Sequence, residues 1–419
     1  MSDTTATLSA AQSQKKPGIL GGAMIVAGTA IGAGMFALPV YSAGMWFSVS
    51  IAMLVFCCFC AYSSGLYLAE SSLNYRDGAS FTTIAADTLG PIGKLIATGS
   101  VAFVSFILCY AYISGGSSVV AQTAASVDIE ISHSAAAIIF AVVFSAVVLA
   151  GSRMVDRVAT IMLGGMVLTF FSSTGMMVGT VNTASLFPAI DLSESGSYVW
   201  IAIPMLVTSF GYHGTVPSLV KHYQKDISRV RQALLLGTGL TLLVYIVWQL
   251  TIMGNVSRDQ FGEIVAQGGN VATLISAVGQ STDVSGVESI LMMFGNLALA
   301  SSFIGVALGL LDLVKDTLSL DDSMKGTLTA GTITFLPPAL LGAALPHGFI
   351  TAIGFAALAA SIFVLVLPPL MARVLRKRGQ SQGFQTAGGL LRLDLVLAFG
   401  VLAVLVEVAN LAGMLPQFS

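Results

Sequence analysis

Charged residues are scarce in this sequence of 419 residues, because Asp, Glu, Lys and Arg together make up only 9%. A soluble globular chain usually contains about 25%. So little charge cannot cover a water-facing surface, whereas it can cover a surface that faces membrane lipid. The hydrophobic content of 55% and the mean hydropathy of +0.88 fit the lipid environment. The sequence therefore predicts an all-α polytopic membrane protein.

Cysteine and histidine are also rare, with four of each. The cysteines lie inside apolar runs, with no metal-ligand spacing and no pattern of a disulfide framework (Cys57, Cys58, Cys60 and Cys109). The histidines fall in separate regions without an HExxH motif, which argues against a membrane-embedded enzyme (His133, His213, His222 and His347). The net charge of -2 argues against a nucleic-acid partner.

Long apolar runs are abundant. A spanning helix needs about 20 mostly apolar residues. This window predicts eleven spans, at residues 18–41, 44–70, 95–125, 135–151, 156–180, 198–220, 231–254, 285–313, 326–345, 348–371 and 392–414. The polar residues 1–17 precede them as an N-terminal tail. Because the first run is too long for the apolar region of a signal peptide, we interpret it as a retained span.

The positions of the basic residues predict how the spans are oriented. If Lys15 and Lys16 are cytoplasmic, the alternation of eleven spans leaves Arg258 alone outside, and the other 17 of the 18 Lys and Arg residues inside. This strong bias follows the positive-inside rule. One miscounted span would scatter the charges over both sides. We therefore predict a cytoplasmic N-terminus and tail, with the C-terminus outside.

Two of the spans have glycines at their centres. The first reads Ala27-Gly28-Thr29-Ala30-Ile31-Gly32-Ala33-Gly34 with Pro39 after it, and the sixth reads Thr208-Ser209-Phe210-Gly211-Tyr212-His213-Gly214 with Pro217 after it. Glycine costs about 1 kcal/mol relative to alanine in a helix interior, and proline about 3 kcal/mol. Lipid offers no partner for backbone groups that a break sets free, so a broken helix must line a cavity or lie buried in protein. We predict that both helices are broken. The alternative is that these glycines only permit close helix packing.

The two broken spans are five spans apart, so spans one to five and six to ten have opposite orientations. Broken helices at matching positions of two inverted halves are typical of a transporter binding site. We predict a first repeat at 18–180, a second repeat at 198–371 and an additional span at 392–414. A channel is disfavoured because no filter is repeated by symmetry. Both halves lie in one chain, and the sequence gives no signal for an oligomeric state.

At these residues the chain resembles the hydroxy/aromatic amino acid permeases, and within them the bacterial tryptophan and tyrosine permeases. The motifs that support the resemblance extend from about Gly18 to Pro416: residues 28–35 (GTAIGAGM), 73–75 (LNY), 111–114 (AYIS), 209–214 (SFGYHG), 216–218 (VPS), 300–303 (ASSF), 308–310 (LGL) and 334–338 (TFLPP). The resemblance implies eleven spans, a five-plus-five inverted repeat like that of the leucine-type transporters, and import of tryptophan or tyrosine driven by an ion gradient. It also implies location in the bacterial inner membrane. Asn74 with Tyr75, and Tyr212 before His213, are closer to the tryptophan members. The main alternative is a symporter for another small neutral amino acid such as serine or threonine.

An amino acid presents a carboxylate and an ammonium, which suit the two kinds of half-helix end. We predict that N–H groups near Gly32, Ala33 and Gly34 bind the carboxylate. Carbonyl groups near Ala27, Thr208 and Ser209 should bind the ammonium. The ring of an aromatic substrate also needs aromatic and apolar side chains around it. The candidates are Tyr110, Tyr112, Phe210, Tyr212 and Phe303. Each of them also fits ordinary packing or contact with lipid.

Ionisable groups inside a membrane are costly and usually functional. His213 is the histidine near mid-span; it is a candidate to relay a proton or to form a neutral wall of the substrate site. Glu70 is a candidate coupling residue at the cytoplasmic end of its span, where a solvated or ion-paired carboxylate is the alternative. Asp312 and Glu407 lie near span ends and are expected to be solvated or ion-paired.

The fifth span departs from the family pattern. Family members typically have a lysine in a Leu-Gly-x-Lys-like stretch, and by analogy with related transporters its ammonium stands where others bind sodium. Here the stretch is Leu163-Gly164-Gly165-Met166, and the thioether of Met166 cannot supply that charge. Hydroxyls of Ser301 and Ser302, with carbonyls near Ala27 and Ala30, are candidate sodium ligands, although the serines also fit simple helix packing. The family resemblance favours H⁺ as the coupling ion, whereas Met166 favours Na⁺; no other cofactor is indicated.

Overall fold

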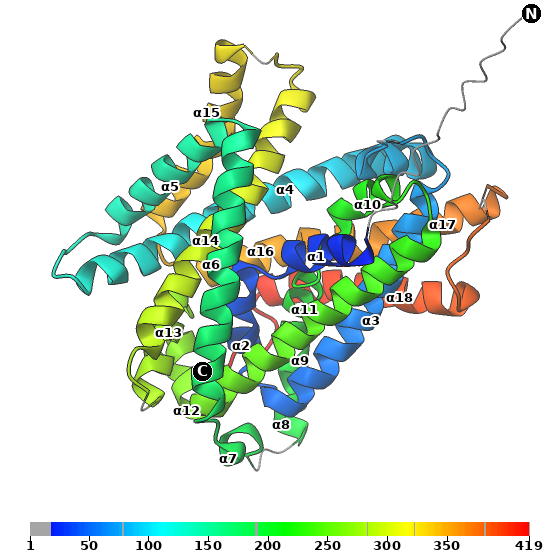
Figure 1. Cartoon of the computed structure of the whole chain (residues 1–419). Coiled ribbons are helices and arrows are strands. Elements are labelled where there is room, and N and C mark those ends of the chain that lie inside the picture. Colours follow the sequence, from blue (N-terminus) through cyan, green and yellow to red (C-terminus); the bar gives the residue numbers. More distant parts are fainter. Residues whose placement is uncertain are drawn as a thin grey trace, which may run out of the picture.

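The computed structural model describes residues 18–77, 79–188, 192–282, 284–321, 323–380 and 383–418, and the secondary structure of these residues is entirely helical (Figure 1). The predicted tail at residues 1–17 lies outside the described residues. The elements are α1 (Ile19–Ala30), η1 (Ala33–Phe36), α2 (Ala37–Ser42), α3 (Trp46–Ser72), α4 (Phe81–Ala125), α5 (His133–Leu149), α6 (Ser152–Val178), α7 (Thr183–Leu186), α8 (Leu192–Ser197), α9 (Val199–Thr208), η2 (His213–Thr215), α10 (Val216–His222), α11 (Ile227–Asn255), α12 (Arg258–Ala266), α13 (Val271–Ser281), α14 (Val287–Thr317), α15 (Met324–Ala344), α16 (Phe349–Ser361), η3 (Ile362–Val366, a π-helix), α17 (Leu367–Lys377) and α18 (Gly389–Leu411).

Nine helical segments of the described chain are long and apolar enough to cross a membrane, and the bent pair formed by α1 and α2 makes a tenth. Helix α5 has 17 residues. At about 1.5 Å per residue it is shorter than a bilayer core of about 30 Å. The prediction of many membrane-spanning helices is thus confirmed, and the chain is a multi-pass membrane protein. The count of eleven remains a prediction that depends on α5.

Helix starts follow the sequence. Side chains at several N-caps accept a hydrogen bond from a backbone N–H in the first turn, as Ser80, Ser132, Asp226, Asn270 and Ser323 do. Such caps satisfy backbone donors that a helix start leaves free. Helix α4 includes a kink at Gly90, whose positive φ of 73° suits glycine, and Pro91 follows. The kink separates the polar first turns of α4 from its long apolar part.

The first predicted break is confirmed. Helix α1 ends at Ala30, Gly32 is extended, and the chain continues through η1 into α2 at an angle of 53° to α1. A Cβ added at Gly32 would lie 2.6 Å from the hydroxyl oxygen of Ser302. Glycine at this position therefore permits the close approach of the broken segment to α14.

The sixth span is also interrupted, as predicted. Helix α9 ends at Thr208, residues 209–212 are not helical, and the chain resumes through η2 into α10, where Pro217 occupies the first turn. Proline is well tolerated there because the first N–H groups of a helix have no partner within the helix. Both interruptions occur where glycines and a downstream proline predicted them.

The broken helices lie at the centre of the bundle. Helix α1 packs along α11, and α14 packs against both α4 and α6 (Figure 1). Short helices α7, α8 and α12 gather at one end of the bundle, which we name the α12 end, and α10 with the end of α17 marks the opposite α10 end. Tyr223, just after α10, donates from its hydroxyl to the carbonyl of Gly18 at 2.9 Å. Arg258 of α12 donates to the carbonyl of Gly44 at 3.2 Å. The two halves of the first span therefore extend toward opposite ends.

Candidate functional site

A cavity of about 530 Å³ lies where the two broken spans meet. Its walls come from both interruptions and from α4, α6, α14 and α16; they include Gly28, Thr29, Ala30, Ile31, Gly32, Gly34, Val104, Ser105, Leu108, Tyr112, Leu163, Met166, Met205, Thr208, Ser209, Gly211, Ser301, Ser302, Gly305 and Ile353. Small residues at the two interruptions expose backbone groups to this space, while apolar side chains form most of the remainder. We name it the central cavity.

The N–H side of the first break faces α14. The backbone N–H of Ala33 donates to the hydroxyl of Ser302 at 3.1 Å, and both Gly32 and Gly34 line the central cavity. Ala33 itself is buried. A Cβ added at Gly34 would meet only the terminal methyl of Met205, at 3.9 Å. The predicted carboxylate-binding glycines thus border open space, and Ala33 lies directly behind them.

The carbonyl side of the breaks is arranged somewhat differently from the prediction. Thr208 and Ser209 line the central cavity. Ala27 is buried and is not among the lining residues, and its carbonyl accepts the N–H of Ile31 at 2.7 Å. Ala30, one turn later, lines the cavity instead. The C-terminal end of α1 therefore contributes Ala30 to the cavity wall, and the carbonyl of Ala30 accepts the hydroxyl of Tyr245 at 2.7 Å.

The predicted sodium ligands converge in part. Ala30, Ser301 and Ser302 line the same cavity, and so does Met166 from α6, with its side chain 5% exposed. Carbonyl and hydroxyl oxygens are hard ligands of the kind that suits a hard cation. No group of three or more His, Cys, Asp or Glu side chains arranged for a metal occurs in the described part of the chain. The chemistry of the donors therefore fits an alkali cation better than a transition metal.

Among the predicted ring walls, Tyr112 lines the central cavity. Phe210 is fully buried and packs against Tyr245 with ring centroids 5.5 Å apart. Phe303 is fully buried and packs against Phe140 at 5.7 Å. In this conformation Phe210 and Phe303 stand behind the cavity wall.

The two other predicted tyrosines are also placed outside the lining. Tyr110 donates from its hydroxyl to the carbonyl of Leu345 at 3.0 Å. Tyr212 is fully buried and donates to the carbonyl of Ala61 at 3.1 Å. A Cβ added at Gly65 would lie 2.7 Å from the Tyr212 hydroxyl oxygen. Tyr212 therefore fixes the interrupted sixth span against α3.

His213 lies beside the sixth-span break and is fully buried. Its ring stacks on Tyr212 with centroids 4.8 Å apart and contacts Phe363 at 6.3 Å. Neither ring nitrogen makes a hydrogen bond of normal geometry to a described residue, and His213 is not part of the cavity lining. The structure thus places this coupling candidate next to the site, behind its wall.

Glu70 lies at the α10 end, away from the central cavity. Both of its carboxylate oxygens accept hydrogen bonds from the Arg376 guanidinium at 2.7 Å, and the N–H of Thr386 donates to the same carboxylate at 2.8 Å. Glu70 is 2% exposed, and Arg376 is 11% exposed. Of the alternatives for Glu70, the structure therefore contains the ion-paired carboxylate, and the ion pair joins α3 to α17.

We expect Glu70→Gln to lower stability and leave the coupling ion unchanged. Removing one partner from a buried ion pair costs about 3–5 kcal/mol because the other charge remains buried. The apparent melting temperature of the purified protein should fall by several degrees. The control is Asp394→Asn, which breaks an exposed pair with Arg373 and should have little effect. A stable Glu70→Gln protein with altered ion dependence would instead assign Glu70 to coupling.

The expectation for Glu407 was wrong. This carboxyl is 1% exposed on α18, and no ion pair to it occurs among the described residues. Its hydrogen-bond partner is the side-chain amide of Asn410, at 3.4 and 3.5 Å. A Cβ at Gly354 would lie 3.3 Å from the carboxyl, so α16 covers it closely. Proximity to a span end did not imply access to water, because α16 packs over this face.

Four aromatic side chains close the central cavity toward the α12 end. Phe36, from η1, lies 5.4 Å from both Trp248 and Phe294, and Phe170 lies 5.7 Å from Phe294. All four are buried. We name them the aromatic cluster. The sequence did not single them out, because each lies among many apolar residues and only the packing of four helices brings them together.

The central cavity is accessible from the other side. Gly28, Thr29 and Gly305 are cavity-lining residues and are exposed, whereas Met35 and Phe36 beyond the first break are buried. Because α1 extends toward the α10 end and α2 toward the α12 end, access is from the α10 side.

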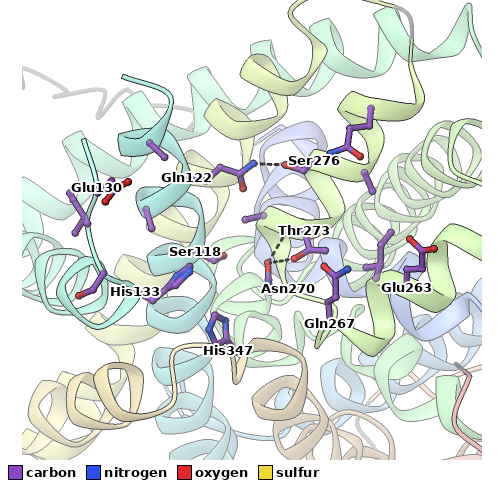
Figure 2. Close-up of a pocket in the computed structure, with 18 of the residues that line it drawn as sticks. Ser118, Gln122, Glu130, His133, Glu263, Gln267, Asn270, Thr273, Ser276 and His347 are labelled. Atoms are coloured by element: carbon purple, nitrogen blue, oxygen red, sulfur yellow. Dashed lines mark hydrogen bonds between the residues drawn. The ribbon is translucent and has the colours of Figure 1, made fainter. Parts of the chain in front are cut away.

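A second and more polar cavity, of about 920 Å³, lies at the α12 end (Figure 2). His133 and His347 face each other there with ring centroids 4.8 Å apart, and Gln122 donates to Ser276. Helix α13 presents Asn270, Thr273 and Ser276 to this cavity. The other side of α13 covers the aromatic cluster, because a Cβ at Gly295 would lie 3.2 Å from Ile275 and 3.6 Å from Phe36. Helix α13 and the aromatic cluster thus separate the two cavities.

A multi-pass helical bundle with two interrupted spans around one cavity is the architecture of a membrane permease. The same fold occurs in the crystal structure of a mutant manganese transporter of Eremococcus coleocola, with a TM-score of 0.59 at 11% identity, covering 94% of this chain and 86% of that one. The chain belongs to the tryptophan/tyrosine permease family, whose model matches residues 15–407. It is therefore a transport protein and not an enzyme.

Similar curated proteins span nearly the same length. A tryptophan-specific transport protein of Pseudomonas aeruginosa is 42% identical over 96% of this chain and 97% of its own. A low affinity tryptophan permease of Escherichia coli is 36% identical over 97% and 99%. A tyrosine permease of Enterobacter agglomerans is 34% identical over 96% and 98%. The resemblance inferred from the sequence motifs is confirmed.

Proposed function

We propose that this permease imports an aromatic amino acid, tryptophan first and tyrosine next, across the bacterial inner membrane by ion-coupled alternating access. The observation that best supports the proposal is the central cavity, where both broken spans offer backbone groups and an apolar wall adjoins them. Its volume of about 530 Å³ is within the range of ligand sites for small molecules. The names of the similar permeases support the aromatic substrate.

The proposed topology has eleven spans, with α5 as the fourth and shortest, and inverted repeats at residues 18–180 and 198–371 followed by the span 392–414. Lys221, Lys225 and Arg378 lie at the α10 end, whereas Arg258 starts α12 at the other end. The positive-inside rule then makes the α10 end cytoplasmic, with the N-terminus inside and the C-terminus outside. In this orientation the central cavity is open to the cytoplasm.

The substrate's two charged groups are proposed to bind at opposite sides of the breaks. The carboxylate accepts hydrogen bonds from the N–H groups of Gly32, Ala33 and Gly34. At Ala33 it takes the place of the Ser302 hydroxyl as the acceptor. The ammonium donates to the carbonyls of Thr208, Ser209 and Ala30. The carbonyl of Ala30 takes the role that the sequence analysis predicted for Ala27. No charged side chain is required, because half-helix ends supply the partial charges.

The aromatic ring of the substrate is proposed to extend along the apolar wall of the central cavity, beside Tyr112, Met205 and Ile353. Tyr112 offers a ring that is already at the surface of the cavity. Tyr110, Phe210, Tyr212 and Phe303 remain candidates to contact the ring in a conformation in which the helices have moved. Phe210, Tyr212 and Phe303 each directly follow a residue that lines the cavity.

Sodium is the proposed coupling ion, held by the carbonyl of Ala30 and the hydroxyls of Ser301 and Ser302, beside the neutral Met166. Proton coupling through His213 or Glu70 is the alternative. The ion pair of the buried Glu70 with Arg376 and the position of His213 outside the lining both favour sodium. The bound cation would add positive charge next to the carboxylate of the substrate.

The test is uptake of radiolabelled tryptophan into proteoliposomes that contain the purified protein, with sodium and proton gradients imposed separately. We expect uptake with an inward sodium gradient alone. Uptake driven by protons alone would retain the substrate and reject the sodium site. Competition by unlabelled tyrosine, but not by serine or threonine, is expected. Inhibition by serine or threonine with no uptake of tryptophan or tyrosine would reject the aromatic substrate.

A further inference from the structure

Tyr245 of α11 joins the two broken spans directly. Its hydroxyl oxygen lies 2.7 Å from the carbonyl oxygen of Ala30, at the end of α1, and 2.7 Å from the carbonyl oxygen of Ser209, at the end of α9. The side chain is fully buried. Ala30 and Ser209 both line the central cavity, and Tyr245 itself does not. The hydroxyl therefore contacts these carbonyls from behind the cavity wall.

A phenol hydroxyl has one hydrogen and two carbonyl oxygens have none, so only one of these contacts can be a full hydrogen bond at a time. Outside the helices, no backbone N–H of a described residue donates to either carbonyl. Both carbonyls lie at helix C-termini, where the helix dipole is negative. Two electron-rich oxygens are thus held close together and share too few donors. A cationic group with several N–H donors, placed on the cavity side, would satisfy both.

We propose that Tyr245 is a positioning residue that holds the carbonyls of Ala30 and Ser209 at the spacing that binds the substrate ammonium. The inference rests on the proposed function and adds a basis for specificity. A ligand that has the ring and the carboxylate but lacks the amino group leaves the second carbonyl without a donor. By fixing the spacing at which one ammonium reaches both carbonyls, Tyr245 would determine the preference for amino acids over their deaminated analogues.

The hydroxyl can be removed without removing the ring. The ring of Tyr245 packs against Phe210, the residue after Ser209, at 5.5 Å. In Tyr245→Phe this ring contact remains, while the restraint on the two carbonyls is lost. Thr241→Val is a matched control one turn earlier on α11, because the Thr241 hydroxyl is buried and donates at 3.0 Å to the carbonyl of Gly237 in its own helix.

The experiment compares two ligands by competition against radiolabelled tryptophan on purified protein: tryptophan itself and indole-3-propionate, which lacks the amino group. In Tyr245→Phe we expect tryptophan to bind about ten- to a hundredfold more weakly, because a displaced carbonyl loses its charge-assisted hydrogen bond from the substrate ammonium. Binding of indole-3-propionate should change by less than about twofold, so the ratio of the two affinities collapses. Thr241→Val should keep the wild-type ratio. Tyrosine and 3-(4-hydroxyphenyl)propionate form a second pair.

An equal loss for both ligands, or an unchanged ratio, would overturn the proposal, since a purely structural role weakens both alike. If Tyr245→Phe does not fold, 3-fluorotyrosine at position 245 keeps the ring and makes the hydroxyl a stronger donor; the ratio should shift, and an unchanged ratio would again reject the role. Wild-type protein that binds neither aromatic amino acid would reject the proposed function as well. Wild-type binding with an unaltered ratio in the variants rejects the role of Tyr245 alone.

Discussion

Replacing Gly34 by leucine is expected to abolish binding of the aromatic amino acid. A Cβ at this position meets only the flexible end of Met205, at 3.9 Å, so the fold has room for a side chain. The room is the central cavity itself, and a leucine would occupy the place proposed for the carboxylate. We expect affinity for tryptophan to fall by at least about a hundredfold, equivalent to about 2.7 kcal/mol. Equilibrium binding of radiolabelled tryptophan to the purified variant measures this loss.

Two controls distinguish a blocked site from a damaged fold. Gly34→Ala adds one methyl group at ordinary contact distance, and the variant should retain measurable binding. Gly99→Leu places the same bulk on an exposed face of α4, where nothing lies within 4 Å of the added Cβ, and its affinity should equal that of the wild type. Wild-type affinity in a folded Gly34→Leu protein would show that the carboxylate binds elsewhere.

Replacing Met166 by lysine is expected to remove the sodium dependence of transport. Met166 lines the central cavity together with Ser301, Ser302 and Ala30. A lysine ammonium there would compete with the cation. Two unit charges roughly 5 Å apart repel by about 3 kcal/mol at an effective dielectric constant of about 20, which corresponds to more than a hundredfold weaker sodium binding. Uptake by the variant, measured with and without sodium, should become the same.

The neutral replacement Met166→Leu keeps the volume without the charge, and it should keep the sodium dependence of the wild type. Sodium-driven uptake that persists in Met166→Lys would contradict the proposed cation site. Loss of sodium dependence in both variants would mean that the side-chain shape at position 166 matters more than its charge.

Local sequence was sufficient for several features. The apolar runs predicted the spans because a helix in lipid must be mostly apolar. The glycines of residues 28–34 and 211–214 predicted the two interruptions because glycine disfavours a helix interior. The backbone groups that such a break sets free must then line a cavity or lie buried in protein. Of the residues predicted to bind the charged groups of the substrate, Gly32, Gly34, Thr208 and Ser209 line one cavity, and Ala30 lines it where Ala27 does not. The motifs along the chain were enough to identify the family.

Hydropathy gave much less information about which side of each span faces the site. In lipid an outward face is as apolar as a packed one, so amphipathic patterning does not distinguish them. Phe210 and Phe303 were therefore both candidates for a ring wall from the sequence, and the structure places both behind the cavity wall. Glu407 fitted a solvated span end, and α16 covers it.

Apolar runs, glycines and short motifs were enough to predict a multi-pass helical permease with two interrupted spans and no charged side chain at their centres. The groups that meet there depend on helix packing and could not be predicted: the Tyr245 hydroxyl between Ala30 and Ser209, Ser302 on the N–H of Ala33, and the aromatic cluster that closes one side. The difference comes from the sequence range over which each feature is determined. A helix break follows from the conformational preferences of a few neighbouring residues, whereas contacts between residues hundreds of positions apart depend on how whole helices pack.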